Sequence, residues 1–74
     1  MTMMIDPREE NFRRLANLRV NNVLEDLRKV GNLANTATYR WSDAERDRMF
    51  SEMRNKLTEV EGRFKARQKR KFRI

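Results

Sequence analysis

Apolar residues recur at alternating steps of three and four in two segments of this 74-residue chain. They are Ala16, Val20, Val23, Leu27, Val30 and Ala34 in the first segment, and Phe50, Met53, Leu57, Val60 and Phe64 in the second. A repeat of 3.5 residues is typical of α-helices that pack along one another at a shallow angle. The sequence therefore predicts an all-α fold, an antiparallel two-helix hairpin with coiled-coil-like seams.

Two short patterns predict where the helices begin. Residues 6–9 have the sequence Asp-Pro-Arg-Glu, and residues 42–45 have the sequence Ser-Asp-Ala-Glu. In each, a side chain that can cap free amide groups is followed three residues later by a glutamate that can reach back, as in a capping box. We therefore expect Ser42 to cap a helix rather than to act as a nucleophile.

Glycines predict where the helices end. We expect a first helix over about 7–31, closed near Gly31 by a left-handed glycine, and a second helix over about 43–61. Gly62 favours a break there, because a glycine inside a helix costs about 1 kcal/mol relative to alanine. The linker, residues 31–41, is longer than the three or four residues of a DNA-reading helix-turn-helix, so the spacing disfavours that motif.

Charge divides the chain into two parts. Residues 1–62 contain all eleven acids and eleven cations, so they form a neutral body, predicted to be the helical hairpin, and the whole net charge of +7 belongs to residues 63–74. This basic C-terminal arm requires an anionic partner or acts only in solubility. The candidate nucleic-acid-binding residues are Arg63, Lys65, Arg67, Lys69, Arg70, Lys71, Arg73 and Phe72.

Basic residues occupy every second position of the arm, which is the period of a strand. An extended arm would place six cations along one edge, at a step comparable to that between successive phosphates of a nucleic-acid strand. The interspersed phenylalanines could stack on bases. A solvated extension, an anionic membrane surface and an acidic protein surface are the alternatives.

Missing residue types exclude several classes of site. The chain has no histidine and no cysteine, which removes the usual general base, the commonest zinc ligand, disulfides and thiolate sites. We therefore expect a protein that is not an enzyme, holds no metal or cofactor and takes no small-molecule substrate. No apolar run is long enough for a signal peptide or a membrane span, so the expected location is the cytoplasm.

The first helix carries more apolar surface than one hairpin seam uses. A chain this short buries little of its own surface, so a homo-oligomer, a four-helix assembly or docking onto a protein partner is expected. The candidate interface residues are Phe12, Leu15, Leu18, Leu24 and Trp41. Trp41 could instead pack locally, since it directly precedes a helix.

Polar residues border this apolar stripe. Arg19, Asn22 and Asp26 recur on one flank of the first helix, one or two turns apart. They fit a half-exposed polar border, or a set that selects register or partner at an oligomer interface.

Two stretches carry a resemblance to known proteins: Arg19-Val20-x-x-Val23-Leu24-x-x-Leu27-x-x-Val30-x-x-Leu33-Ala34-Asn35, and then Tyr39-x-Trp41-Ser42-x-x-Glu45. This pattern resembles small uncharacterised helical proteins of phages and plasmids, which implies a mobile-element context. A fainter similarity to the haemolysin-modulating Hha family, whose members partner a nucleoid protein, is carried by Tyr39, Ser42, Asp43, Glu45 and Phe50. The longer linker and the basic C-terminal arm depart from that family.

The function predicted from these features is non-specific binding of DNA or RNA backbone through the basic C-terminal arm, without catalysis. The alternative is a phage or mobile-element inhibitor or adaptor that binds a host or defence protein complex.

Overall fold

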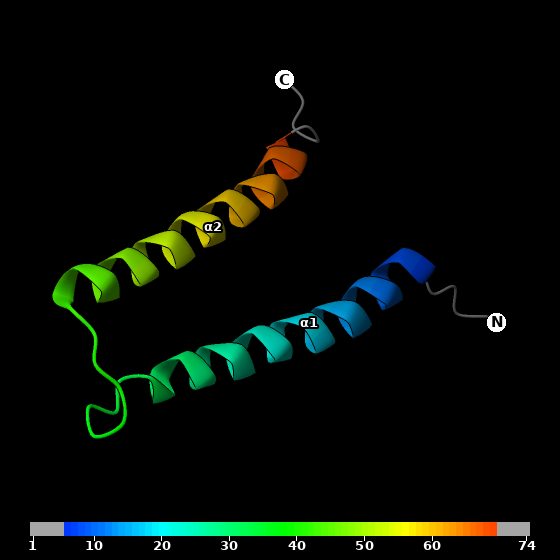
Figure 1. Cartoon of the computed structure of the whole chain (residues 1–74). Coiled ribbons are helices and arrows are strands. Elements are labelled where there is room, and N and C mark those ends of the chain that lie inside the picture. Colours follow the sequence, from blue (N-terminus) through cyan, green and yellow to red (C-terminus); the bar gives the residue numbers. More distant parts are fainter. Residues whose placement is uncertain (1–5, 70–74) are drawn as a thin grey trace. The chain divides into compact units, whose positions relative to one another are not determined.

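The computed structural model describes residues 6–69, with side chains up to Arg67, and contains two α-helices in that range. Helix α1 is Pro7–Asn32 and helix α2 is Asp43–Lys69, and no strand occurs among the described residues (Figure 1). The prediction of an all-α chain with two helices is confirmed. The chain divides into two units, Met1–Tyr39 and Arg40–Ile74, each described by itself. The antiparallel packing of a hairpin stays a prediction.

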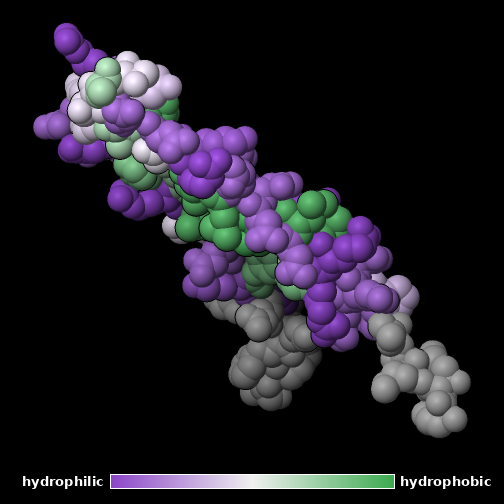
Figure 2. All heavy atoms as spheres, turned by 90° about the horizontal axis from the view of Figure 1, so that it is seen from below, coloured by the Kyte–Doolittle hydropathy of each residue, from purple (hydrophilic) through white to green (hydrophobic). Residues whose placement is uncertain are grey.

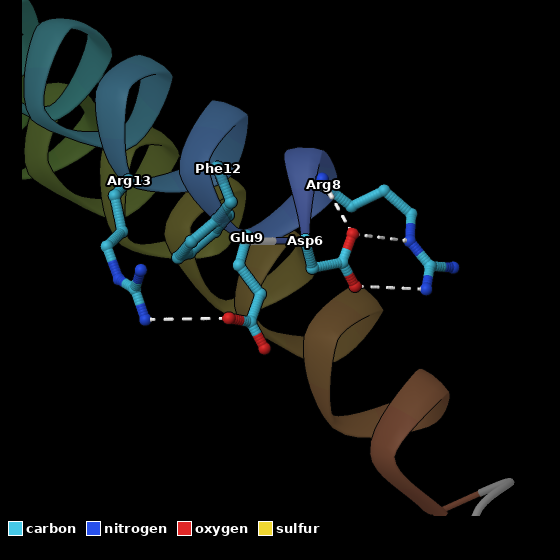
Figure 3. Close-up of a pocket in the computed structure, with 5 residues that line it drawn as sticks. All are labelled: Asp6, Arg8, Glu9, Phe12 and Arg13. Atoms are coloured by element: carbon cyan, nitrogen blue, oxygen red, sulfur yellow. Dashed lines mark hydrogen bonds and ion pairs between the residues drawn. The ribbon is translucent and has the colours of Figure 1, made fainter. Parts of the chain in front are cut away.

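The start of α1 is capped as predicted. Asp6 has extended backbone angles, and its Oδ1 accepts a hydrogen bond of 2.9 Å from the backbone N–H of Arg8. The Arg8 guanidinium bonds the same carboxylate, and these two contacts, the side-chain one foremost, hold the pKa of Asp6 below its ordinary value. The expected return bond from Glu9 is replaced by an ion pair with Arg13 at 3.9 Å (Figure 3).

Helix α1 ends at Asn32, within one residue of the predicted end, but its cap has a different conformation from the predicted one. Gly31 lies inside the helix with no positive φ, and the cap residue Leu33 is right-handed, at φ −69° and ψ −12°. Leu33 N–H donates to the Val30 carbonyl at 3.0 Å, and Ala34 N–H donates to the Gly31 carbonyl at 3.1 Å. These bonds span three residues and tighten the last turn, which satisfies open carbonyls without a left-handed glycine.

The linker contains a turn around Asn35. The Asn35 side-chain oxygen accepts from Ala37 N–H at 3.0 Å, and its carbonyl accepts from Thr38 N–H at 3.2 Å and Tyr39 N–H at 2.9 Å. An asparagine whose side chain bonds the backbone two residues on is a standard turn former. The linker therefore has its own local hydrogen bonds.

Helix α2 begins with the complete capping box. Ser42 Oγ accepts from Glu45 N–H at 3.1 Å, and Glu45 Oε1 accepts from Ser42 N–H at 2.8 Å. The bond from the Ser42 backbone is the main cause of a lowered pKa of Glu45. The predicted capping role of Ser42 is confirmed.

Replacing Ser42 with alanine should destabilise the start of α2 by about 1 kcal/mol, because the Glu45 amide loses its acceptor. Circular dichroism should show lower helix content and a lower melting temperature. Ser51→Ala is the matched control, since Ser51 is exposed in the middle of α2 and alanine favours helix there. Equal melting of Ser42→Ala and Ser51→Ala would contradict this role.

Helix α2 continues past Gly62, so the predicted break at that residue is wrong. Two ion pairs at four-residue spacing span the glycine: Arg63 to Glu59 at 3.3 Å and Lys65 to Glu61 at 3.9 Å. Gly62 has no positive φ, and a Cβ at this position would meet no atom within 4 Å, so the backbone here does not require a glycine. The modest cost of one interior glycine is offset by continued helix hydrogen bonding and by these favourable pairs.

No side chain described in the structure is buried, and large apolar residues on both helices are exposed. The exposed fractions reach 68% for Leu57, 61% for Phe64, 57% for Phe12 and 56% for Leu24. Figure 2 shows green apolar surface open to solvent among purple polar side chains. The described residues therefore contain no hydrophobic core.

Candidate nucleic-acid interface

Helical backbone through Lys69 changes the geometry predicted for the basic arm. At about 100° per residue, Arg63 and Arg67 lie about 40° apart on one side of α2, whereas Lys65 lies about 160–200° from them. The predicted single edge of alternating cations is therefore wrong for residues 63–69. Lys69 is the last residue of α2, while Arg70, Lys71, Phe72 and Arg73 lie outside the described residues.

Arg63 and Arg67 retain the axial distance that was predicted between neighbouring cations of an extended arm. Residues four apart in a helix are separated by about 6 Å along its axis. This rise is close to the step expected between alternate cations of an extended arm. Over the described part of the arm, the helix thus presents one pair of cations at that step rather than a continuous alternating edge.

Two cations of the site are paired with acids of the preceding turn. The Arg63–Glu59 and Lys65–Glu61 pairs are solvent-exposed, with side chains 53–71% accessible. Glu59 is shared with Lys56, whose 3.0 Å contact is the main cause of the lowered pKa of Glu59. Exposed pairs of this kind are weak, so both cations can exchange a carboxylate for a phosphate.

Arg67 is the first described cation beyond these acids. No ion pair in the described part of the chain involves Arg67, and its side chain is exposed. Phe64, between the two basic sides of the helix, is 61% exposed. The described part of the site is therefore an open cationic helix end with one aromatic ring.

Trp41 lies against the first turn of α2. Its ring centroid is 5.9 Å from the guanidinium of Arg46, which also bonds Asp47 at 3.0 Å and Asp43 at 3.2 Å. Its indole Nε1 is buried and has no hydrogen-bond partner among the described residues. Trp41 therefore packs locally against the start of α2. The role of Arg46 was missed, and its signal is the cation five residues after the tryptophan.

The other candidate interface residues do not share one face. Phe12, Leu18 and Leu24 are 55–57% exposed, and Leu15 is half-exposed. On α1, Phe12 and Leu24 flank opposite sides of the apolar stripe, and Leu18 lies about 120° from each of them. A partner surface that covers the apolar stripe therefore cannot also contact Leu18, which lies about 160° from the centre of the stripe.

Two further classes of site are absent from residues 6–69. No group of three or more acidic, histidine or cysteine side chains is placed to hold a metal ion. Neither described helix has an apolar stretch able to cross a bilayer.

No family model, curated protein or solved structure gives a significant match to the chain. The resemblances to phage and plasmid proteins and to the Hha family therefore stay predictions.

Proposed function

We propose that the chain is a nucleic-acid-associated protein that binds DNA or RNA backbone through the cationic end of α2 and the residues that follow it. The observation that carries this proposal is the charge distribution: after Glu61 the sequence has seven cations and no acid. Exposed cations without a geometry for reading base edges favour phosphate contacts, which carry no sequence information.

The helical geometry limits how the cations can engage. Arg63 and Arg67 can face one backbone together, while Lys65 points to the other side of α2. A single duplex is therefore expected to neutralise about six of the seven cations, which gives a log–log salt slope of about −5. Binding should fall about a thousandfold between about 50 and 200 mM salt.

A salt titration of binding to a DNA duplex and to a single-stranded RNA tests the proposal. Arg67→Gln should reduce the slope by about 0.9, since it removes one phosphate contact. Arg14→Gln is the matched control, because it removes one cation from exposed surface of α1. A wild-type slope near zero, or equal effects of the two variants, would refute the proposal.

Exposed apolar surface favours a second candidate, a protein-binding inhibitor or adaptor. Leu57 is 68% exposed and Leu18 is 55% exposed, which is more apolar surface than nucleic-acid binding requires. In that case the cations steer encounter with an acidic or nucleic-acid-loaded target. The complex would then survive nuclease treatment and removal of residues 63–74.

A further inference from the structure

Helix α1 presents a continuous apolar stripe that no part of its own unit covers. None of its side chains is buried, and five residues along the stripe are 44–57% exposed: Phe12, Val20, Val23, Leu24 and Leu27. Most helical stability in proteins comes from packing of an amphipathic face. A helix of 26 residues with this stripe is therefore suited to a partner helix.

Arg19 lies on the edge of the stripe without a partner. Each of the other cations of α1 has one: Arg8 with Asp6, Arg13 with Glu9, Arg14 with Asn11, Arg28 with Glu25 and Lys29 with Asp26. Arg19 makes no ion pair or side-chain hydrogen bond among the described residues. Among the cations of α1, Arg19 is therefore the one available to pair with an acidic side chain of another helix.

Asp26 is the acid placed to meet Arg19 of another helix. The two residues lie two turns apart and about 20° from each other on the same flank of the stripe. Asp26 has only a marginal contact of its own, at 4.0 Å to Lys29, and its side chain is 76% exposed. Opposite charges on one flank are self-complementary when two copies of the helix run in opposite directions.

A two-fold axis near residue 22 makes this arrangement specific. In that register Arg19 of each copy faces Asp26 of the other, which forms two ion pairs across the axis. The stripe then packs Val20 against Val23 and Leu27 against Ala16 of the second copy. The ends of the flank pair Phe12 with Leu33, and Val30 meets the aliphatic part of Arg13, so the centre of the interface is apolar and its ends are mixed.

A parallel arrangement lacks this complementarity. It would place Arg13 of one copy beside Arg13 of the other, since equivalent stripe positions then face each other. Arg19 would face Leu24 of the second copy, and Asp26 would face Gly31. The antiparallel register therefore gives Arg19 an acidic partner, whereas the parallel register leaves it unpaired.

We propose that the stripe of α1 is a self-association surface, covered by α1 of a second copy in antiparallel orientation, and that the Arg19–Asp26 pairs across the axis set its register. This interface is separate from the nucleic-acid site at the end of α2.

Two charge-reversal variants of the full-length protein test the proposal. The self-association of each variant, and of their mixture, is measured by analytical ultracentrifugation at low salt. Arg19→Asp alone should raise the dimer dissociation constant about tenfold or more, because an acid of one copy then faces an acid of the other on both sides of the axis. Asp26→Arg alone should raise it by a similar factor, because a cation then faces a cation at the same two places. An equimolar mixture of the two variants should associate as tightly as wild type. In the mixed dimer every facing pair has opposite charges.

The mixture separates the proposed interface from the alternatives. If α2 of the same chain covers the stripe, mixing cannot rescue either variant, because the defect stays within each chain. Arg14→Asp is the control for net charge, since Arg14 lies on the side of α1 away from the stripe, and it should leave association unchanged. A wild-type chain that stays monomeric, or a mixture no tighter than its components, would overturn the proposal.

Discussion

A chain that ends at Gly62 should bind a DNA duplex at least about a thousandfold more weakly than the full chain at about 50 mM salt. The truncation removes every cation in excess of the acids and leaves a body with no net charge. Counterion release by about six phosphate contacts supplies essentially all of the affinity of a non-specific binder. Fluorescence anisotropy with labelled DNA or RNA measures the loss.

Two full-length variants show whether charge or chain length causes this loss. Replacing all seven cations of residues 63–74 with glutamine keeps the length and should reproduce the truncation. Scrambling the order of those residues keeps the charge and should retain most of the affinity, since the affinity of a non-specific binder follows the number of phosphates that its cations neutralise. Equal binding by the truncated and full chains would contradict the proposed function.

Local chemistry explains which parts of the fold could be predicted from the sequence. The caps at Asp6 and Ser42 depend on a few neighbouring residues, so the sequence determines them and the structure confirms both. Helix ends depend on a balance of small terms. At Gly62 the predicted break rested on the cost of one glycine, which continued helix hydrogen bonding outweighs, and at Gly31 the helix ends near the predicted place but with a right-handed cap.

The prediction of an extended basic arm, which is wrong for residues 63–69, also rested on too few terms. An alternation of basic and other residues indicates a strand only where one face of the strand is buried. Without a buried face, the same sequence is equally compatible with a helix. Residues 63–67 are all exposed and have no such face. The acids at four-residue spacing, Glu59 before Arg63 and Glu61 before Lys65, were the signal for helix.

The candidate site was only partly accessible to sequence reasoning. The position of the excess charge follows from composition alone, and Arg63, Lys65 and Arg67 are exposed as a cationic site requires. Their distribution around α2 required the backbone conformation. What covers the apolar stripe of α1 depends on contacts between helices, which no local pattern determines.

Replacing Leu27 with aspartate should abolish self-association and most cooperative helix melting together. Leu27 lies near the centre of the α1 stripe and is 44% exposed, so a large effect requires that a partner helix covers it. An unpaired charge placed in a buried contact costs several kcal/mol. Light scattering and circular dichroism on the same samples measure both losses.

Leu24→Asp and Asn21→Asp place the same charge elsewhere on α1. Leu24 lies about 60° from Leu27, at the edge of the stripe, so its replacement should weaken association while most helix content remains. Asn21 lies about 120° from Leu27, and its replacement should leave mass and melting unchanged. A loss of association that is largest for Leu27→Asp, smaller for Leu24→Asp and absent for Asn21→Asp indicates one apolar face packed against another helix. Wild-type mass and melting in Leu27→Asp would show instead that nothing covers the stripe.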